Sequence, residues 1–348
     1  MKRNRIRTLL VVAALPLALN LAACGGSQPG EGPAHRVTIP PGASFSAVAD
    51  SLEARDIVGS PTFFRLYARL VGAADGVQAG TYEFREGAGY RHVLDDLTAG
   101  RIAADRLVLP EGYQIQQIVP ALAELVPLPA DSIVRYMLDT ATASRFGVPG
   151  PTLEGYLYPA TYIVPAGAPL DSIIGRMVQE HMRRWTPERQ ARADSAGFSH
   201  REVVTLASIV EKEARVRDEM QKIAAVYRNR LEIGYALQAD PTVQYALGEH
   251  QNRLLYSHIE SVADHPYNTY EHPGVPPGPI GAPSDRAIDA VLDPADVDYL
   301  YFVARPDGTH VFNRHLVDHN RAKARIRQER TAQGRGAEAQ DKSAPASR

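Results

Sequence analysis

The clearest hydrophobic pattern in the chain is a helical one that begins at residue 199. Ser199 and Glu202 have the Ser-x-x-Glu spacing of a capping box, which satisfies free backbone N–H groups of a first helical turn. Apolar residues then recur along one face: Val203, Leu206, Ala207, Val210 and Ala214. This spacing predicts a helix with one side buried in a core.

A strand–turn–helix pattern occurs twice. RVTIPPGASFSAVADSL at residues 36–52 and RLVLPEGYQIQQIVPAL at residues 106–122 each combine a short apolar strand, Pro-x-Gly and a helix. The apolar positions of both helices follow i, i+3, i+4, i+7 spacing: Phe45, Val48, Ala49 and Leu52, then Ile115, Ile118, Val119 and Leu122. Two copies are too few for a solenoid, so we interpret them as the openings of two successive domains.

Shorter signals complete the first of these domains. Ser60-Pro61 is typical of a helix start, Val77–Phe84 of a strand, and Tyr90–Ala99 of a short helix that ends at Gly100. Residues 36–105 are therefore expected to form a small α+β module.

Residues 106–330 are expected to form a larger mixed α/β domain, which makes the fold class α+β. A helix with an apolar face is expected to stop at Gly234, and Asp240-Pro241 has the form of an N-cap followed by proline, with Gly248 ending that helix. Pro306-Asp307-Gly308 indicates a hairpin between two short strands. Residues 331–348 lack apolar periodicity, and we expect a disordered tail.

The start of the chain has the features of a targeting signal. Residues 1–23 contain four basic residues, a short apolar run and small residues before Cys24, as in a secretory signal peptide. Cys24 is the only cysteine, and Leu-Ala-Ala before it resembles the lipobox of bacterial lipoproteins. The resemblance implies cleavage before Cys24 and attachment of lipid to its sulfur; the alternative is an ordinary signal peptide with an incidental cysteine. Residues 24–35, rich in Gly, Pro and Ser, predict a flexible tether.

Composition and motif content exclude several classes of protein. The 348 residues are 44% hydrophobic and 22% charged, with a net charge of −2. No basic surplus is present to bind a phosphate backbone, so no nucleic-acid partner is expected. G-x-S-x-G, H-E-x-x-H and P-loop motifs are absent. The histidines are scattered among turn-forming residues without a shared carboxylate pattern, so neither a metal site nor another cofactor is expected.

Two glutamates lie near the end of the helix that is predicted to begin at residue 199. Glu211 and Glu213 lie on an otherwise apolar helix, and each is followed four residues later by an arginine, Arg215 or Arg217. The simplest interpretation is two surface ion pairs, worth roughly 0.3–0.5 kcal/mol each. On a helical wheel, small residues flank Glu211 and leave room for a ligand, whereas larger residues flank Glu213 and suit packing. This difference favours Glu211 as a functional group only slightly.

Two other stretches combine aromatic and amide side chains. LEGYLYPATY at residues 153–162 places three tyrosines near Glu154, and YNTY at residues 267–270 precedes the rigid GVPPGPI segment. Aromatic faces and amide groups suit a groove for sugar rings, through stacking and hydrogen bonds to hydroxyl and N-acetyl groups. The alternative, that the tyrosines belong to the core and the prolines only stiffen a connection, is equally open.

Five motifs in one order resemble the endolytic murein transglycosylase family, also called YceG-like or MltG. They are ASIVEKEA (207–214), LEGYLYPATY (153–162), NRLEIGYALQADPTVQYALG (229–248), PYNTY with GVPPGPIGAP (266–283) and YLYFVARPDGTHVFN (299–313). The resemblance covers residues 36–325, and residues 36–105 resemble the family's LysM-like domain. Family members commonly begin with a transmembrane helix, whereas this chain begins with a lipobox, which leaves open which membrane holds it.

The resemblance implies a lytic transglycosylase in which the first glutamate of the E-K-E pair, here Glu211, is the catalytic acid and base. Its substrate is the bond between N-acetylmuramic acid (MurNAc) and N-acetylglucosamine (GlcNAc) within glycan strands, and the product is a 1,6-anhydro end. An acid that acts near neutral pH must keep its proton, so we expect Glu211 to be buried.

The remaining expectations follow from the same resemblance. Candidate substrate-binding residues are Gln238, Asn268, Tyr270, Glu154 and Tyr158, while Asp240 is assigned to a helix cap. The implied partners are peptidoglycan strands, a membrane through the lipid anchor, and cell-wall synthases. The implied location is the periplasmic side of the cell envelope. The alternatives are a hydrolytic muramidase with Glu154 or Asp240 as a second carboxylate, or a non-catalytic peptidoglycan-binding lipoprotein.

Overall fold

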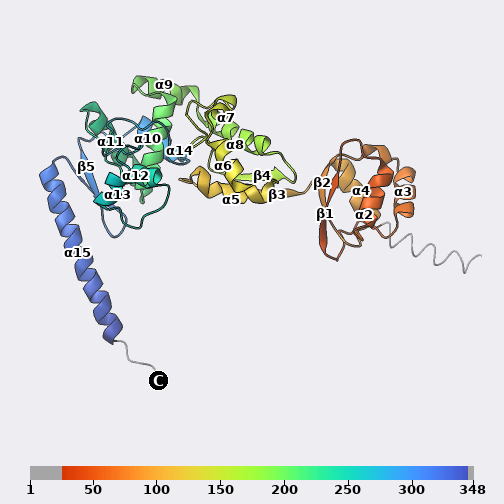
Figure 1. The fold of residues 1–348 in the computed structure, drawn as a ribbon. Coiled ribbons are helices and arrows are strands. Elements are labelled where there is room, and N and C mark those ends of the chain that lie inside the picture. The colour runs from red at the N-terminus through yellow and green to blue at the C-terminus, as the bar shows by residue number, and fades with distance from the viewer. Residues whose placement is uncertain (1–25, 344–348) are drawn as a thin grey trace, which may run out of the picture. The chain divides into compact units, whose positions relative to one another are not determined.

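A computed structural model describes residues 26–343, with side chains described as far as residue 329. The predicted signal peptide, Cys24 and the last five residues lie outside the described part. The chain divides into two units (Figure 1). The described residues up to Leu107, together with Tyr162–Pro169, form the N-terminal unit, and Val108–Thr161 with the residues from Leu170 onward form the C-terminal unit.

The N-terminal unit combines helices with two-stranded sheets. Its elements are β1 (Ala34–Ile39), α2 (Phe45–Glu53), α3 (Pro61–Leu70), η1 (Ala74–Gly76), β2 (Gly80–Arg85), α4 (Tyr90–Ala99), β3 (Ala104–Val108) and β4 (Thr161–Pro165). β1 pairs with β2 in antiparallel register, with Val37 opposite Tyr82. Alternate residues of both strands, among them Val37 and Tyr82, join α2, α3 and α4 in one apolar core.

The C-terminal unit is mainly helical. Its helices are α5 (Ile115–Leu125), α6 (Ala130–Met137), α7 (Thr140–Arg145), α8 (Leu170–Arg184), α9 (Pro187–Ser195), α10 (His200–Glu213), η2 (Arg217–Glu219), α11 (Met220–Glu232), α12 (Asp240–Leu247), α13 (Tyr256–Ser261), α14 (Asp285–Leu292) and α15 (Leu316–Ser343). β5 (Tyr301–Ala304) and β6 (His310–Asn313) form an antiparallel hairpin. The mixed α and β content confirms the expected fold class; the likeness to LysM stays a prediction.

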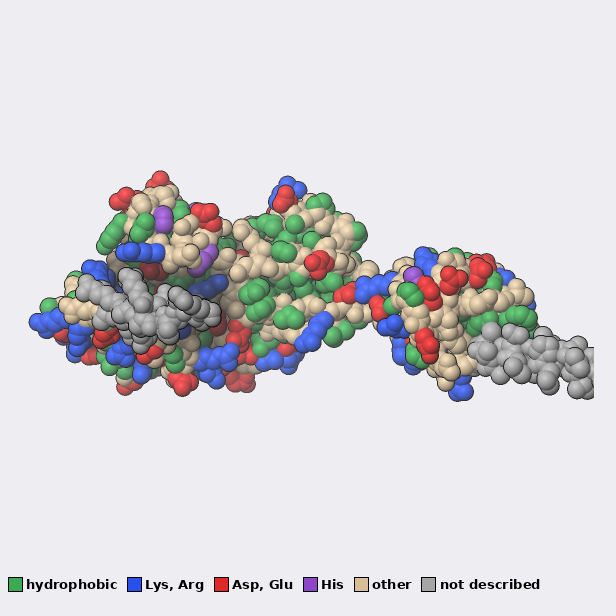
Figure 2. Space-filling model, turned by 90° about the horizontal axis from the view of Figure 1, so that it is seen from below, with side chains coloured by type: hydrophobic (Ala, Val, Ile, Leu, Met, Phe, Trp, Pro, Cys, Tyr) green, Lys and Arg blue, Asp and Glu red, His purple; other side chains and the backbone are tan. Residues whose placement is uncertain are grey.

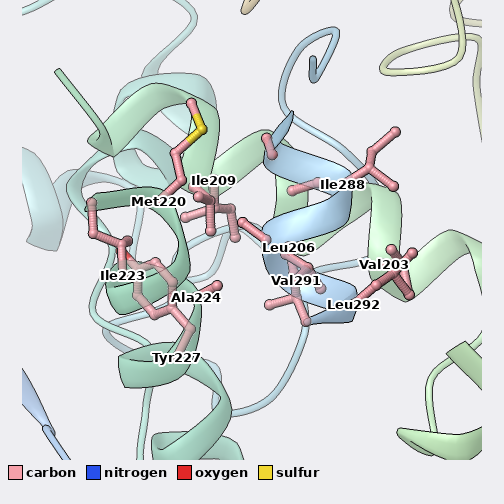
Figure 3. Packing of buried hydrophobic residues seen from close by; sticks show 14 of the residues in the cluster. Val203, Leu206, Ile209, Met220, Ile223, Ala224, Tyr227, Ile288, Val291 and Leu292 are labelled. Atoms are coloured by element: carbon pink, nitrogen blue, oxygen red, sulfur yellow. The ribbon is translucent and has the colours of Figure 1, made fainter. Parts of the chain in front are cut away.

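Helices α10, α11 and α14 enclose the core of the C-terminal unit. Figure 3 shows Leu206 and Ile209 of α10 packed between side chains of α11 and Val291 of α14. These residues are at most 5% exposed. Burying a large aliphatic side chain contributes roughly 1.5–3 kcal/mol, so this cluster fixes the position of α10 and of the glutamates at its end.

Most of the local signals in the sequence are confirmed. The capping box of Ser199 and Glu202 is present, and Gly100 and Gly248 close their helices in the left-handed conformation, with φ of +65° and +71°. The hairpin around residues 306–308 is present as β5 and β6. The first strand–turn–helix copy forms β1 and α2, and the second forms β3 and α5.

Two local expectations are wrong. Asp240 does not cap α12: the N-cap is Ala239, and no side chain accepts a hydrogen bond there. The chain from residue 331 to Ser343 continues α15 as a helix instead of being disordered. That stretch is rich in Ala, Gln, Glu, Lys and Arg, which favour helix without any apolar face.

Candidate active site

Glu211 lies in the last turn of α10 and is held by the start of α14. The backbone N–H of Ser284 donates to Glu211 Oε2 over 3.0 Å, and the Ser284 hydroxyl donates to the same oxygen. Ser284 is also the N-cap of α14, where its oxygen accepts from the N–H of Ala287. The positive end of a second helix therefore faces the Glu211 carboxyl group.

The other carboxyl oxygen of Glu211, Oε1, has no hydrogen bond within residues 26–329. Glu211 is partly exposed, so the expectation of a buried glutamate is wrong for this residue. No ion pair joins Glu211 to Arg215 in the same part of the chain, because α10 ends at Glu213 and the i,i+4 geometry is lost. One oxygen is thus fixed, and the other is left without a hydrogen bond on a partly exposed residue.

A glycine forms the wall beside Glu211. Gly112 has φ of +74°, and a Cβ built there would lie 3.7 Å from Glu211 Cγ. Its N–H donates to the carbonyl of Ala282 over 2.7 Å, and the N–H of Ala282 donates to the carbonyl of Tyr113 over 2.8 Å. These two bonds pin the loop before α5 to the segment that leads into Ser284, so a backbone wall with no side chain borders the carboxyl group.

Glu154 is the buried carboxyl group of the site. It is 3% exposed, and both of its oxygens accept from the N–H of Ile115, the first residue of α5, over 3.1 and 3.2 Å. Burial raises the pKa of Glu154 to about 8, against the opposing effects of this hydrogen bond and of Lys212. The Lys212 ammonium interacts electrostatically with both Glu154 and Glu211.

A small cavity adjoins Glu154. It has a volume of about 170 Å³ and is lined by Gln114, Gln116, Leu138, Glu154, Tyr245 and Gly248. The ring of Tyr245 lies 4.9 Å from that of Tyr267, centroid to centroid. Amide groups and an aromatic face therefore lie around Glu154, and their role in binding sugar stays a prediction.

Glu213 points away from this side. It accepts a hydrogen bond from the Tyr227 hydroxyl over 3.0 Å, and Tyr227 is 1% exposed in the core of the C-terminal unit. Burial, reinforced by the negative charge of Asp240, raises the pKa of Glu213 to about 7. Asp240 in turn accepts from the hydroxyl of Tyr270 over 2.6 Å, so Tyr270 belongs to the Glu213 cluster.

Gln238 and Asn268, two of the predicted binding residues, differ in availability. Gln238 is exposed and has φ of +48°, a conformation that costs energy for a residue other than glycine, and its N–H is bonded to the carbonyl of Thr269. Its side chain is thus held outward. Asn268 is 0% exposed: its amide donates to the carbonyls of Ile259 and Val262, and its oxygen accepts from the N–H of Tyr270. Its side chain shapes the loop and is not placed to touch a ligand.

Tyr158 lies in an ionic network at the start of α14. Its hydroxyl donates to Asp285 over 2.8 Å, and the Arg184 guanidinium stacks over its ring at 4.7 Å. Arg184 and Arg189 both pair with Asp285. Tyr158 therefore supports the helix whose first turn holds Glu211.

Sequence reasoning missed Ser284, which bonds to Glu211, and Gly112, which lies beside its side chain. Ser284 directly follows the GVPPGPIGAP motif and precedes an apolar helical run, which is an N-cap signal. Gly112 is in the Pro-x-Gly turn of the second repeat. Neither signal indicates contact with Glu211, because the pairing joins residues 73 positions apart.

Within the described residues, no group of three or more His, Cys, Asp and Glu side chains is arranged to hold a metal ion. None of the described helices is long and apolar enough to span a membrane.

A partly exposed glutamate held by a helix N-cap is an arrangement that can serve general acid–base chemistry. The chain matches the YceG-like family over residues 37–325 and belongs to that family. It is 35% identical over 306 residues to a Bacillus subtilis protein named endolytic murein transglycosylase, covering 82% of this chain and 83% of the relative. A Streptococcus pneumoniae protein of the same name is 28% identical, and the match covers 57% of its length.

A solved structure agrees with this assignment. The crystal structure of a yceG-like protein from Listeria monocytogenes superimposes with a TM-score of 0.57 at 32% sequence identity. The match covers 84% of this chain and 100% of that one.

Proposed function

We propose that this chain is an endolytic peptidoglycan lytic transglycosylase of the cell envelope, with Glu211 as its general acid and base. Membership of the YceG-like family and the names of the relatives support the class of enzyme. The observation that carries the assignment of Glu211 is its asymmetric carboxyl group. Ser284 fixes Oε2, and Oε1 remains free beside the Gly112 wall.

One carboxyl group is enough for this reaction. Protonated Glu211 gives its proton to the glycosidic oxygen between MurNAc and GlcNAc as the bond from C1 to that oxygen breaks. The carboxylate then accepts the proton of the muramyl C6 hydroxyl, whose oxygen attacks C1 and closes a 1,6-anhydro ring. The nucleophile belongs to the substrate, so no water molecule has to be positioned. The two donors of Ser284 stabilise the negative charge that forms on Glu211 when its proton leaves.

A hydrolase would need a second carboxylate near the sugar. Glu154 is 3% exposed and engaged with the N-terminus of α5, and Asp240 is bonded to Tyr270 in the Glu213 cluster. Glu154 therefore presents no free carboxylate to a sugar ring, which favours the anhydro product over hydrolysis with Glu154. Asp240 is exposed and bonded through one oxygen, and product analysis separates the anhydro product from hydrolysis with Asp240.

Sugar binding is assigned to side chains around the two glutamates. We place the exposed Gln238 and the cavity beside Glu154 and Tyr245 in the glycan groove. Tyr158 and Tyr270 act through Asp285 and Asp240. We further propose that the LysM-like module at residues 36–105 binds glycan, that lipid on Cys24 anchors the chain, and that cell-wall synthases are partners.

Product analysis tests the function. Purified glycan strands are digested with the wild-type protein and with Glu211→Gln, and the new ends are identified by mass spectrometry. We expect 1,6-anhydro-MurNAc ends within the strands from the wild type and none from the variant. Reducing MurNAc ends would instead identify a muramidase, and binding without cleavage by the wild type would identify a non-catalytic lipoprotein.

A further inference from the structure

A polar hollow of about 460 Å³ lies on the C-terminal unit, where α9, η2, α11 and α14 meet. Figure 2 shows basic and acidic side chains interspersed on part of the surface of this unit. The charged groups that line the hollow are Arg192, Arg217, Arg286, Asp218, Asp289 and Asp293. A volume of this size is in the range of small-ligand sites.

The arginines of the hollow are weakly engaged. Arg286 lies 3.8 Å from Asp218, whose side chain is 95% exposed. Arg217 pairs with Glu111 over 3.0 Å, and the side chains of the pair are 65% and 43% exposed. Exposed pairs of this kind contribute roughly 0–1 kcal/mol, so an anionic ligand can replace the present partners at small cost.

The charge of Asp289, one of the aspartates that line the hollow, is already balanced by Arg189. Asp289 accepts two hydrogen bonds from Arg189, at 3.1 and 3.0 Å, and the Arg189 side chain is only 11% exposed. Its remaining contact with Arg192 is long, at 3.4 Å. The positive charge of Arg192 is therefore only partly matched within the hollow.

Two arginines of the hollow are linked to the residues around Glu211. Arg286 is two residues beyond Ser284, the residue that holds Glu211. Arg217 pairs with Glu111, and the next residue, Gly112, lies against the Glu211 side chain. These links place the hollow in the neighbourhood of the candidate site.

We infer that this hollow binds the peptide stem carried by the muramic acid residue that Glu211 attacks, an inference that rests on the proposed function. The stem is joined to the lactyl group of that sugar and carries carboxylates, which the guanidinium groups of Arg217 and Arg286 match in shape and charge. The aspartates of the lining suit an amino group on the same peptide. The hollow thus distinguishes peptide-bearing glycan from bare glycan.

The test compares two substrates. Glycan strands with intact stems and strands stripped of stems by an amidase are digested by the wild type and by Arg217→Gln/Arg286→Gln. We expect the double variant to lose at least tenfold more kcat/KM on intact strands than on stripped strands. Arg228→Gln, which removes an exposed arginine paired with Glu232 on α11, is the matched control and should behave as wild type on both substrates. Equal losses on the two substrates would overturn the inference.

A binding measurement separates this inference from the proposed function. Calorimetric titration of the Glu211→Gln protein with a free stem tetrapeptide requires no catalysis. We expect Arg217→Gln/Arg286→Gln in that background to weaken the Kd at least tenfold. If the wild type cleaves no glycan but the arginines still govern peptide binding, the proposed function fails and the site stands. Unchanged binding in the double variant sinks the site whatever the activity.

Discussion

Glu211 and Glu213 are two residues apart on α10 and both are partly exposed, yet their carboxyl groups have different hydrogen-bond partners. Glu211 is partly exposed and held by the N-cap of α14, with one oxygen free. Glu213 turns toward the core, where Tyr227 donates to it and burial raises its pKa to about 7. Glu154 resembles Glu213 in this respect, since burial raises its pKa to about 8.

The difference between the glutamates lies in what their carboxyl groups contact. The two carboxyl groups whose pKa is raised by burial are both bonded within the protein, Glu154 to Ile115 and Glu213 to Tyr227. Glu211 has one oxygen without a hydrogen bond, and its side chain lies beside Gly112. We propose Glu211 as the acid–base group on this geometric ground.

The largest expected effect comes from replacing Glu211 and Glu213 separately with glutamine, the neutral isostere, which tests whether the two residues have different roles. Glu211→Gln should lower the rate of glycan cleavage at least a thousandfold, because a glutamine can neither give nor accept the proton, a role worth roughly 10²–10⁴-fold in rate. Glu213→Gln should stay within about threefold of wild type, since an amide oxygen can still accept from Tyr227. Release of soluble fragments from labelled peptidoglycan measures both.

The control for the Glu211→Gln and Glu213→Gln variants is to show that both are folded. Thermal unfolding of both variants should show one cooperative transition close to that of the wild type. If Glu213→Gln loses as much activity as Glu211→Gln while remaining folded, the assignment of roles to the two residues is wrong.

The second prediction concerns Glu154 and the pH dependence of the free energy of unfolding. The pKa of Glu154 is raised on folding from 4.5 to about 8, so the folded state binds more protons than the unfolded state between these values. Stability contributed by this group is present below pH 4.5 and is lost as pH rises through about 8. Glu154→Gln should therefore match wild type near pH 4.5 and exceed it at pH 9 by about 4–5 kcal/mol.

Urea denaturation at several pH values checks this expectation. Other carboxyl groups titrate as well, so the informative quantity is the difference between the two proteins at each pH. A difference that does not grow between pH 5 and pH 9 would show that Glu154 is charged in the folded protein.

The helices could be predicted from the sequence more completely than the candidate site. Ser199 with Glu202, Gly100 and Gly248 mark helix ends through contacts within a few residues, and these signals were sufficient. The bond from Ser284 to Glu211 spans 73 residues, and no periodic pattern encodes it. Asn268 shows the same limit: an amide in an aromatic loop suits sugar binding, but its burial against Ile259 and Val262 depends on how the loop folds back. The return of Tyr162–Pro169 to the N-terminal unit is likewise a long-range feature.

The smallest expected effect on activity concerns the Ser284 hydroxyl, which bonds to Glu211 and not to Glu213. Ser284→Ala removes the hydroxyl donor to Glu211 but keeps the backbone N–H, so the carboxyl group is still held by one bond. We expect kcat to fall about 10–100-fold, equivalent to about 1.4–2.7 kcal/mol, with KM within twofold of wild type.

Loss of the N-cap of α14 should also cost about 1 kcal/mol in stability. Ser44→Ala removes a comparable N-cap from α2 in the N-terminal unit, far along the chain from Glu211, and controls for the stability loss. If both variants lower kcat equally, Ser284 acts only as a cap, and the asymmetric carboxyl group loses its role in the mechanism.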